Sequence, residues 1–433
     1  MNQFVVSLGL LLPVGYAVLR MGVLRREDYL YHAGRTPFVQ TLASIICGNI
    51  GIGSFVALFL FTAQSPLVGF VVVFAYCLGL VLCGALAARI HAAARATGSY
   101  GLIDWLVTVH GPRHPVLVWL PVAVVFGLRT VIQLLALALI LQITFALPPP
   151  LALALATLVV GSYTAIGGYR VATETDLPQA VVILIGIGAI AWALVQDGAR
   201  IPGDAPHLWE LGPYAPGFVV AIVVFLPFSA VLAIDNWQRI ATSDTGGNAR
   251  IAYFAAALIC APVFLTAAWV GWISGASGGA GMAEVIATFR TLMPFGWSWL
   301  ADLTIMLAVM SSIDTFVMPL ITPMARTRSR MWQIRAAVVM VFVALGGVAW
   351  MLGDVVVSII SAFNTLVVFL PAVFGALVLR DRAPRATTLS MGVGVAVTLA
   401  LSVVALQQAA VAGFVVSAAI YAAFRPRGQR NLQ

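Results

Sequence analysis

The chain has 433 residues, of which 62% are hydrophobic and only 9% are charged, whereas about a quarter of the residues in a typical soluble domain are charged. A mean hydropathy of +1.04 therefore excludes an ordinary soluble protein and predicts an all-α polytopic membrane protein. The net charge of +8 comes from 23 arginines, with no lysine, against 15 acidic residues. Most of these arginines lie in connectors on one predicted side of the membrane. They therefore set the topology and do not indicate a nucleic-acid partner.

Apolar runs close to the ~20 residues that a helix needs to cross the hydrocarbon predict about thirteen transmembrane helices. The first run is interpreted as a retained helix and not as a signal peptide, because no basic segment precedes it and no small-residue cleavage site follows it. The connectors are too short to hold a soluble core, so residues 1–433 are expected to form a single membrane domain. The predicted spans are 3–22, 38–62, 66–90, 115–144, 150–168, 178–197, 216–239, 249–274, 297–325, 334–352, 355–379, 388–407 and 409–424.

The arginines orient these helices. With the N-terminus outside and the C-terminus inside, twenty arginines fall in cytoplasmic connectors, Arg200 and Arg290 fall outside, and Arg129 lies within a span. This distribution satisfies the positive-inside rule. The lack of lysine and the abundance of alanine suggest a GC-rich genome, so we expect a multi-pass protein of the bacterial cytoplasmic (inner) membrane.

Ten of the thirteen helices divide into two sets of five, 38–197 and 216–379. Residues 1–37 supply the first helix and a connector, and 380–433 supply two extra helices and a basic tail. Because five is odd, the second set inserts with the opposite orientation. Two sets of five helices with opposite orientation are typical of an inverted repeat. In such folds solute and ions bind near the midplane, where the first helix of each half is interrupted.

Both candidate first helices contain interruptions. Residues 48–54 hold three glycines and Asn49, and residues 225–229 hold Pro227, which removes a main-chain N–H. Glycine and proline also occur in membrane helices as close-packing positions or harmless kinks, but the matched placement favours two broken helices. A third polar stretch, 307–316, places Ser311, Ser312 and Asp314 at membrane depth, where ionisable groups are costly to bury and indicate a functional site.

Five sequence motifs resemble those of the sodium:solute symporter family and occur along the chain in the order that the family shows. The third motif, with the pattern Tyr-Thr-x-x-Gly-Gly followed by Thr-Asp-x-x-Gln, is the most specific. The resemblance covers nearly the whole chain and implies thirteen helices, the inverted five-plus-five core of the leucine-transporter fold, and sodium-coupled import of a small organic solute by alternating access. The motifs lie at residues 31–35, 47–50, 163–179, 235–239 and 308–315.

The resemblance also implies where sodium binds. Carried over by position, the site consists of the carbonyls of Cys47, Ile50 and Ala308 and the hydroxyls of Ser311 and Ser312. Broken helices supply uncommitted carbonyls for such a site. The alternative is that both serines bond back to their own helix. A second cation site, for sodium or for a proton shared between two carboxyls, would comprise Asp176, Ser311, Asp314 and Thr315; alternatively, Asp314 faces the cytoplasmic cavity.

Arg129 is the most informative residue for the solute. It lies about 14 residues into its span, roughly 21 Å from the inner end at 1.5 Å per residue, too deep for its charge to reach water. Its guanidinium fork suits a carboxylate, so it either binds an anionic solute or is neutralised internally by Asp235 or Asp314. Other candidate solute contacts are polar or aromatic residues near the two breaks or on facing helices: Asn49, Ser54, Gln64, Gln133, Phe225, Phe228, Ser229 and Asn364.

The favoured function is therefore a sodium-coupled symporter for a small, carboxylate-bearing solute. Sodium is the expected coupling ion, and membrane lipid is the expected partner besides the solute. We expect no organic cofactor, other metal site, nucleic acid or obligatory protein partner. A proton-coupled transporter of the same fold, driven through Asp176 and Asp314, is the first alternative. A transporter-like membrane sensor is the second. An enzyme is not expected, because the chain lacks a zincin motif, a Gly-x-Ser-x-Gly elbow and clustered histidines.

Overall fold

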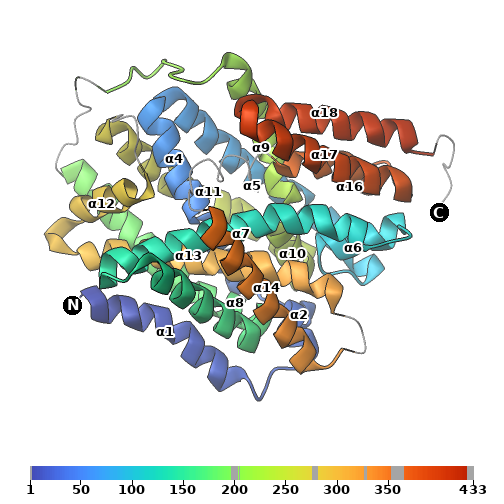
Figure 1. Cartoon of the computed structure of the whole chain (residues 1–433), viewed down its shortest axis with the longest axis horizontal. Helices are drawn as coiled ribbons and strands as arrows, with labels where there is room; N and C mark the ends of the chain where they lie inside the picture. The colour runs from blue at the N-terminus through green and yellow to red at the C-terminus, as the bar shows by residue number, and fades with distance from the viewer. Residues whose placement is uncertain are drawn as a thin grey trace.

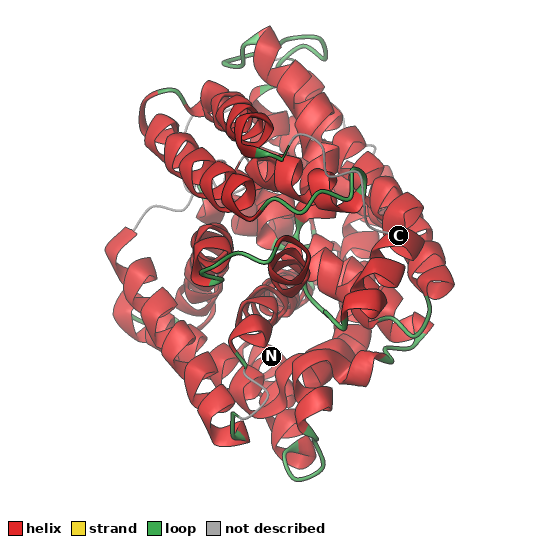
Figure 2. Cartoon of the chain, turned by 90° about the vertical axis from the view of Figure 1, so that its right-hand side faces the viewer, coloured by secondary structure: helices red, strands yellow, loops and turns green. Residues whose placement is uncertain are grey.

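A computed structural model describes residues 2–196, 203, 205–275, 281–325, 329–352 and 365–426. Within these ranges the chain is helical, apart from loops and an isolated parallel bridge between Thr36 and Ser243 (Figure 2). The elements are α1 (Asn2–Arg20), α2 (Arg26–Tyr31), η1 (His32–Gly34), α3 (Phe38–Asn49), α4 (Ile52–Gln64), α5 (Pro66–Thr97), α6 (Leu102–His110), α7 (Val116–Phe145), α8 (Pro149–Gln196), α9 (Pro216–Leu232), α10 (Ile234–Thr242), α11 (Gly246–Ser274), α12 (Met282–Leu292), η2 (Pro294–Gly296), α13 (Ser298–Ile321), η3 (Thr322–Met324), α14 (Met331–Leu352), η4 (Thr365–Phe369), α16 (Leu370–Leu377), α17 (Pro384–Val404) and α18 (Leu406–Phe424).

The polytopic all-α fold predicted from hydropathy is confirmed. Nine of the described helices are long and apolar enough to cross a membrane, or ten when the bent pair α9 and α10 is counted as one span. The count of thirteen is not confirmed, because α3, α4 and α16 are individually short and the predicted span 355–379 is described only from Thr365 onward. The division into two inverted sets of five helices stays a prediction.

Gly168 divides α8 at the boundary between two predicted spans, 150–168 and 178–197. Its φ of 62° and ψ of −157° are non-helical, and glycine adopts a positive φ without the steric cost that other residues incur. The main-chain oxygen of Tyr29 lies where a Cβ on residue 168 would project. The Tyr29 hydroxyl in turn donates to the Ala165 carbonyl at 3.0 Å. The second glycine of the Gly-Gly motif therefore permits both a sharp change of direction and close packing of the first connector.

The predicted break in the first core helix is present between α3 and α4. The helix ends at Asn49 and resumes at Ile52, so only Ile50 and Gly51 are non-helical. The Ser54 hydroxyl donates to the carbonyls of Asn49 (2.9 Å) and Gly51 (2.8 Å). A side chain thus satisfies carbonyls that would otherwise be left unpaired in an apolar environment, which makes the break tolerable at membrane depth.

The second break lies later in the chain than predicted. Pro227 is inside the continuous helix α9, and the bend of 48° occurs at Ala233, between α9 and α10. The prediction of a break at residues 225–229 is therefore wrong in position. Membrane helices tolerate proline when neighbouring groups compensate for the lost hydrogen bond. The actual bend is stabilised by Asn236, whose side-chain amide donates to the Ala230 carbonyl at 2.9 Å.

The helix that carries the serine pair, α13, runs through the centre of the molecule. It is buried along its apolar length, and it packs against α1, α3, α7 and α8. In Figure 1, α1 lies along one edge of the molecule and α17 and α18 lie along another, with α13 between α7 and α8 in the interior. This arrangement places Ser311, Ser312 and Asp314 in the protein interior and keeps them away from lipid.

The short helix α6 carries a buried histidine that connects it to the C-terminal part of the chain. The Ala383 N–H donates to Nδ1 of His110 at 3.1 Å, so the Nε2–H of the neutral ring donates to the Ala372 carbonyl at 3.2 Å. Burial lowers the pKa of His110 below 6.5, and the bond to Ala372 opposes this shift. The neutral ring is therefore the form that the fold stabilises.

We expect wild-type stability to fall as pH decreases from about 6.5, because a protonated Nδ1 cannot accept the Ala383 bond. The folded-state pKa is below the unfolded one, so the stabilisation is complete above the unfolded pKa and is lost as pH falls through the folded one, by at most about 1.4 kcal/mol per pH unit. Burial raises the pKa of Asp104 to about 7. A carboxyl with a raised pKa destabilises the fold as pH increases, and this effect should be equal in wild type and in His110→Gln. Thermal unfolding of wild type and His110→Gln between about pH 5 and 8 tests this, and identical pH profiles would contradict it.

Candidate ion and solute sites

Oxygen atoms from α3 and α13 converge at the first break. The Ser311 hydroxyl lies 3.1 Å from the Ala308 carbonyl and 3.4 Å from the Cys47 carbonyl. The Ser312 hydroxyl lies 3.0 Å from the same Ala308 carbonyl. Both serines are fully buried. Contacts of 3.0 to 3.4 Å therefore link two carbonyls and two hydroxyls from segments far apart in the sequence, a set of oxygen ligands that suits a hard cation.

The remaining predicted ligand, the Ile50 carbonyl, belongs to the non-helical pair at this break. Gly51 packs so closely on α13 that a Cβ there would lie 2.5 Å from Ser312 Oγ and 3.0 Å from Gln133 Nε2. The absence of a side chain thus lets the broken segment approach the serine pair. Both hydroxyls also donate within their own helix, the alternative that sequence left open, and the five-oxygen sodium site stays a prediction.

The predicted second cation site lies next to this cluster. Asp176 and Asp314 are buried and near enough for their charges to interact. The Cys47 thiol contacts the Asp176 carbonyl at 3.2 Å, and the Tyr163 hydroxyl donates to Asp314 Oδ2 at 2.9 Å. The Thr315 hydroxyl donates to the Ser311 carbonyl at 3.0 Å. The residues predicted for this site therefore lie together in the interior, and a role in cation binding stays a prediction for them.

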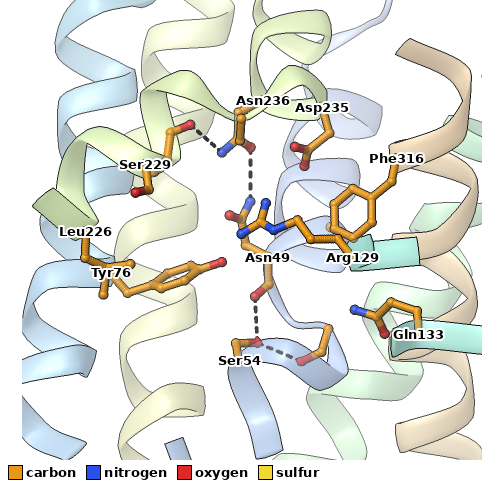
Figure 3. A pocket seen from close by; sticks show the side chains of 14 residues that line it. Asn49, Ser54, Tyr76, Arg129, Gln133, Leu226, Ser229, Asp235, Asn236 and Phe316 are labelled. Atoms are coloured by element: carbon orange, nitrogen blue, oxygen red, sulfur yellow. Dashed lines mark hydrogen bonds between the residues drawn. The ribbon is translucent and has the colours of Figure 1, made fainter. Parts of the chain in front are cut away.

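A small cavity of about 30 Å³ lies between the two broken helices (Figure 3). A buried water needs at least ~10–15 Å³ of such space, so the cavity is contracted around its side chains in this conformation. Five residues predicted to contact the solute line it: Asn49, Ser54, Arg129, Gln133 and Ser229. The other lining residues are Gly48, Gly51, Tyr76, Leu226, Ala230, Ala233, Asp235, Asn236 and Phe316.

Arg129 is the cationic residue in the cavity wall on α7. Its guanidinium carbon lies 5.3 Å from the centre of the Phe126 ring and 5.7 Å from that of Phe316, and cation–π attraction of this kind stabilises a buried cation. Of the two carboxylates considered as its internal counter-ions, Asp235 accepts from Arg239 and Asp314 accepts from Tyr163. Asp235 also interacts electrostatically with Arg129. Each carboxylate thus accepts a hydrogen bond from another residue, and Arg129 interacts with Asp235 as well.

Three described residues that were predicted to contact the solute do not line the cavity. Gln64 is exposed at the end of α4, where it accepts from the Tyr214 hydroxyl at 2.8 Å. Phe225 packs against Phe414 with ring centres 5.0 Å apart. Phe228 is half-buried and is not among the lining residues. In this conformation helical spacing places these three residues on other faces or at other depths than the break, and their role in solute binding stays a prediction. Asn364 lies outside the described residues.

The main residues that the site prediction missed are Tyr76, Asp235, Asn236 and Phe316. The Asn49 side-chain amide donates to Oδ1 of Asn236 at 3.3 Å, so a hydrogen bond joins the two broken helices directly across the cavity (Figure 3). Asp235 and Asn236 belong to a motif that the sequence analysis identified. If the second break had been predicted at Ala233, both residues would have been assigned to the site.

Next to the cavity, a buried arginine connects the same two helices. Arg239 on α10 is 1% exposed. It donates to Asp235 Oδ2 at 2.6 Å and to the Ser44 hydroxyl on α3 at 2.9 Å. Its guanidinium also lies against Gly48, in the space that a Cβ on that residue would occupy. Gly48 is therefore needed for close approach of the arginine and not only for helix breakage.

Comparisons with known proteins agree with this architecture. The sequence model of the sodium:solute symporter family matches residues 29–198, the segment that contains the first three motifs, and confirms the resemblance. No curated protein matches the chain in sequence. Among solved structures, it is similar to the substrate-bound outward-open state of a Na⁺-coupled sialic acid symporter, with a TM-score of 0.71 and 16% identity over 99% of each chain.

The chain is also similar to Mhp1, a nucleobase-cation-symport-1 family transporter, in a closed conformation with bromovinylhydantoin bound. The TM-score is 0.61 at 16% identity, covering 92% of this chain and 94% of that one. For the inward-facing conformation of Mhp1, the TM-score is 0.56 at 15% identity over 92% of each chain. At such identities the likeness shows the fold alone.

Proposed function

We propose that this chain, as a member of the sodium:solute symporter family, imports a small carboxylate-bearing solute together with sodium by alternating access. It is a multi-pass membrane transporter, and we place it in the bacterial inner membrane with its N-terminus outside and its C-terminus inside. The observation that carries the proposal is the convergence of the Cys47 and Ala308 carbonyls with the Ser311 and Ser312 hydroxyls at the first break. In this proposal Ile50 completes the sodium site.

Coupling follows from the position of the break. The space that a Cβ on Gly51 would occupy is bordered both by Ser312 Oγ of the ion cluster and by Gln133 Nε2 of the cavity wall. Sodium would fix the α3–α4 segment in the arrangement that the solute binds, and the solute would favour the arrangement that sodium binds. Each ligand then raises the affinity for the other by the same factor. Arg129 supplies the charge that attracts the solute carboxylate in this scheme.

We expect sodium to raise the melting temperature of purified wild-type protein relative to choline chloride at equal ionic strength. A ligand at 100 times its dissociation constant, bound only to the folded state, adds about 2.7 kcal/mol. Ser312→Ala should lose this increase because one ligand oxygen is removed. Ser402→Ala is a matched control: Ser402 is a buried serine on α17 that donates to the Thr398 carbonyl at 2.8 Å. A sodium response that persists unchanged in Ser312→Ala would contradict the proposed site.

Proton coupling is the second candidate, favoured by the paired burial of Asp176 and Asp314. Two carboxyls that lie close together can hold one proton between them, and they then titrate as a pair. In proteoliposomes, uptake that needs no sodium and collapses with an uncoupler would support this candidate. Uptake that requires a sodium gradient and resists the uncoupler would support sodium coupling.

A further inference from the structure

One carboxylate oxygen of Asp235 is buried at the solute cavity with no hydrogen-bond partner among the described residues. Asp235 is 4% exposed and lies just after the bend between α9 and α10. Its other oxygen, Oδ2, accepts from Nη1 of Arg239 at 2.6 Å. Because that ion pair holds the carboxylate in place, Oδ1 is a fixed hydrogen-bond acceptor in the cavity wall (Figure 3).

A buried acceptor of this kind favours a solute that can donate to it. A polar group that is buried without a hydrogen-bond partner is costly, and more so when it is charged. A donor on the solute would remove that cost on binding. A solute without a donor would leave the cost in place and gain nothing at this position. Asp235 therefore distinguishes solutes by the presence of a donor, as sites built around a hydrogen bond do.

The donor and the solute carboxylate must be close neighbours. Asp235 and Arg129 line the same small cavity, and their charges interact. Tyr76, whose ring also belongs to the wall, interacts electrostatically with both. Because the cavity is small, a solute that reaches Arg129 with its carboxylate and Asp235 with its donor carries the two groups close together.

The charges around Asp235 indicate what kind of donor fits. The Asp235 carboxylate is already paired with the guanidinium of Arg239, and the guanidinium of Arg129 belongs to the same cavity wall. An ammonium group would add a positive charge beside two guanidinium groups in a medium of low dielectric constant, where repulsion is strong. A neutral donor, such as a hydroxyl or an amide N–H, satisfies Oδ1 without that repulsion.

We propose that the transported solute carries a hydroxyl or an amide N–H beside its carboxylate, and that Oδ1 of Asp235 accepts a hydrogen bond from this group. The inference rests on the proposed function and specifies its substrate class. It favours hydroxy acids and N-acylated acids over plain carboxylic acids, and over amino acids with a free ammonium group.

Matched probes test this on the wild-type protein. Binding in sodium chloride is measured for propionate, 2-hydroxypropionate, 2-acetamidopropionate and 2-aminopropionate, and again for phenylacetate and its 2-hydroxy, 2-acetamido and 2-amino derivatives to allow for solute size. We expect the hydroxy or acetamido compound to bind at least about tenfold more tightly than the unsubstituted acid, as for a hydrogen bond to a charged group. Equal affinities across both series, or tightest binding of the amino compounds, would overturn the inference.

Asp235→Asn should abolish the preference for the neutral donor. The readout is the ratio of dissociation constants for the hydroxy and unsubstituted acids within each protein, so a general loss of stability does not affect it. Asp302→Asn is the control, because Asp302 is a buried aspartate whose Oδ1 pairs with Arg290 at 2.6 Å, away from the cavity. An unchanged ratio in Asp235→Asn would contradict the role of Oδ1.

The outcomes separate this inference from the proposed function. If unsubstituted acids bind in sodium as tightly as their hydroxy and acetamido derivatives, the inference fails and carboxylate transport stands. If sodium raises the melting temperature but no carboxylate in either series binds, both the carboxylate assignment and the inference fail, and the sodium site stands.

Discussion

Replacing Arg239 with methionine is expected to lower the free energy of unfolding by about 3–5 kcal/mol, the cost of leaving a buried charge without its partner. The Asp235 carboxylate would lose the donor at 2.6 Å, and the Ser44 hydroxyl would lose its bond from α10. Methionine fills much of the same volume, so the effect reports mainly the lost charge. The melting temperature of the purified protein is the measurement.

Two further variants interpret this result. Arg250→Met, at an exposed arginine of α11, should change the melting temperature little. The double variant Asp235→Asn with Arg239→Met removes both charges and should recover part of the loss, because pairs replaced together are often tolerated where a single replacement is not. If Arg239→Met proved as stable as wild type, Arg239 would not be what holds α10 against α3.

Replacing Arg129 with glutamine is expected to weaken binding of a carboxylate solute by about 2–5 kcal/mol, as when one partner of a buried, hydrogen-bonded charge pair is removed. That range is a factor of roughly 30 or more in Kd. Arg129→Lys should also weaken binding, because an ammonium group lacks the planar fork that holds a carboxylate at two points. The probe is the carboxylate that gives wild type its largest sodium-dependent increase in melting temperature.

The sodium response provides the internal control for Arg129. The ion cluster at Ser311 and Ser312 does not contain Arg129, so sodium alone should still raise the melting temperature of Arg129→Gln. A variant that keeps both the sodium response and the wild-type solute affinity would show that Arg129 is structural, held by the Phe126 and Phe316 rings and by Asp235.

The two sites share structural elements, which bears on how transport is coupled. The α3–α4 break contributes the Cys47 carbonyl to the ion cluster and Asn49 and Ser54 to the cavity. The second break is tied to the first by the bond between Asn49 and Asn236 and by Arg239 against Gly48. A change of state that separates these helices must break both contacts.

Several features of this protein follow from the sequence by itself. The membrane class and the approximate positions of its spans follow because hydropathy is summed over some twenty residues and needs no knowledge of contacts. The first break follows because three glycines and an asparagine within seven residues weaken a helix locally. The burial of Ser311, Ser312 and Asp314 on one helix follows because the lipid environment excludes such groups from its surface.

Only the tertiary structure places the second break and completes the cavity. Pro227 is the stronger local signal, yet α9 continues through it, and the bend at Ala233 depends on the Asn236 bond to Ala230 and on contacts of α10 with α3. Gln64 and Phe225 were plausible by spacing, but their partners, Tyr214 and Phe414, lie 150 and 189 positions away in the sequence. Which face of a helix meets a cavity is decided by packing between distant segments, and no local pattern records it.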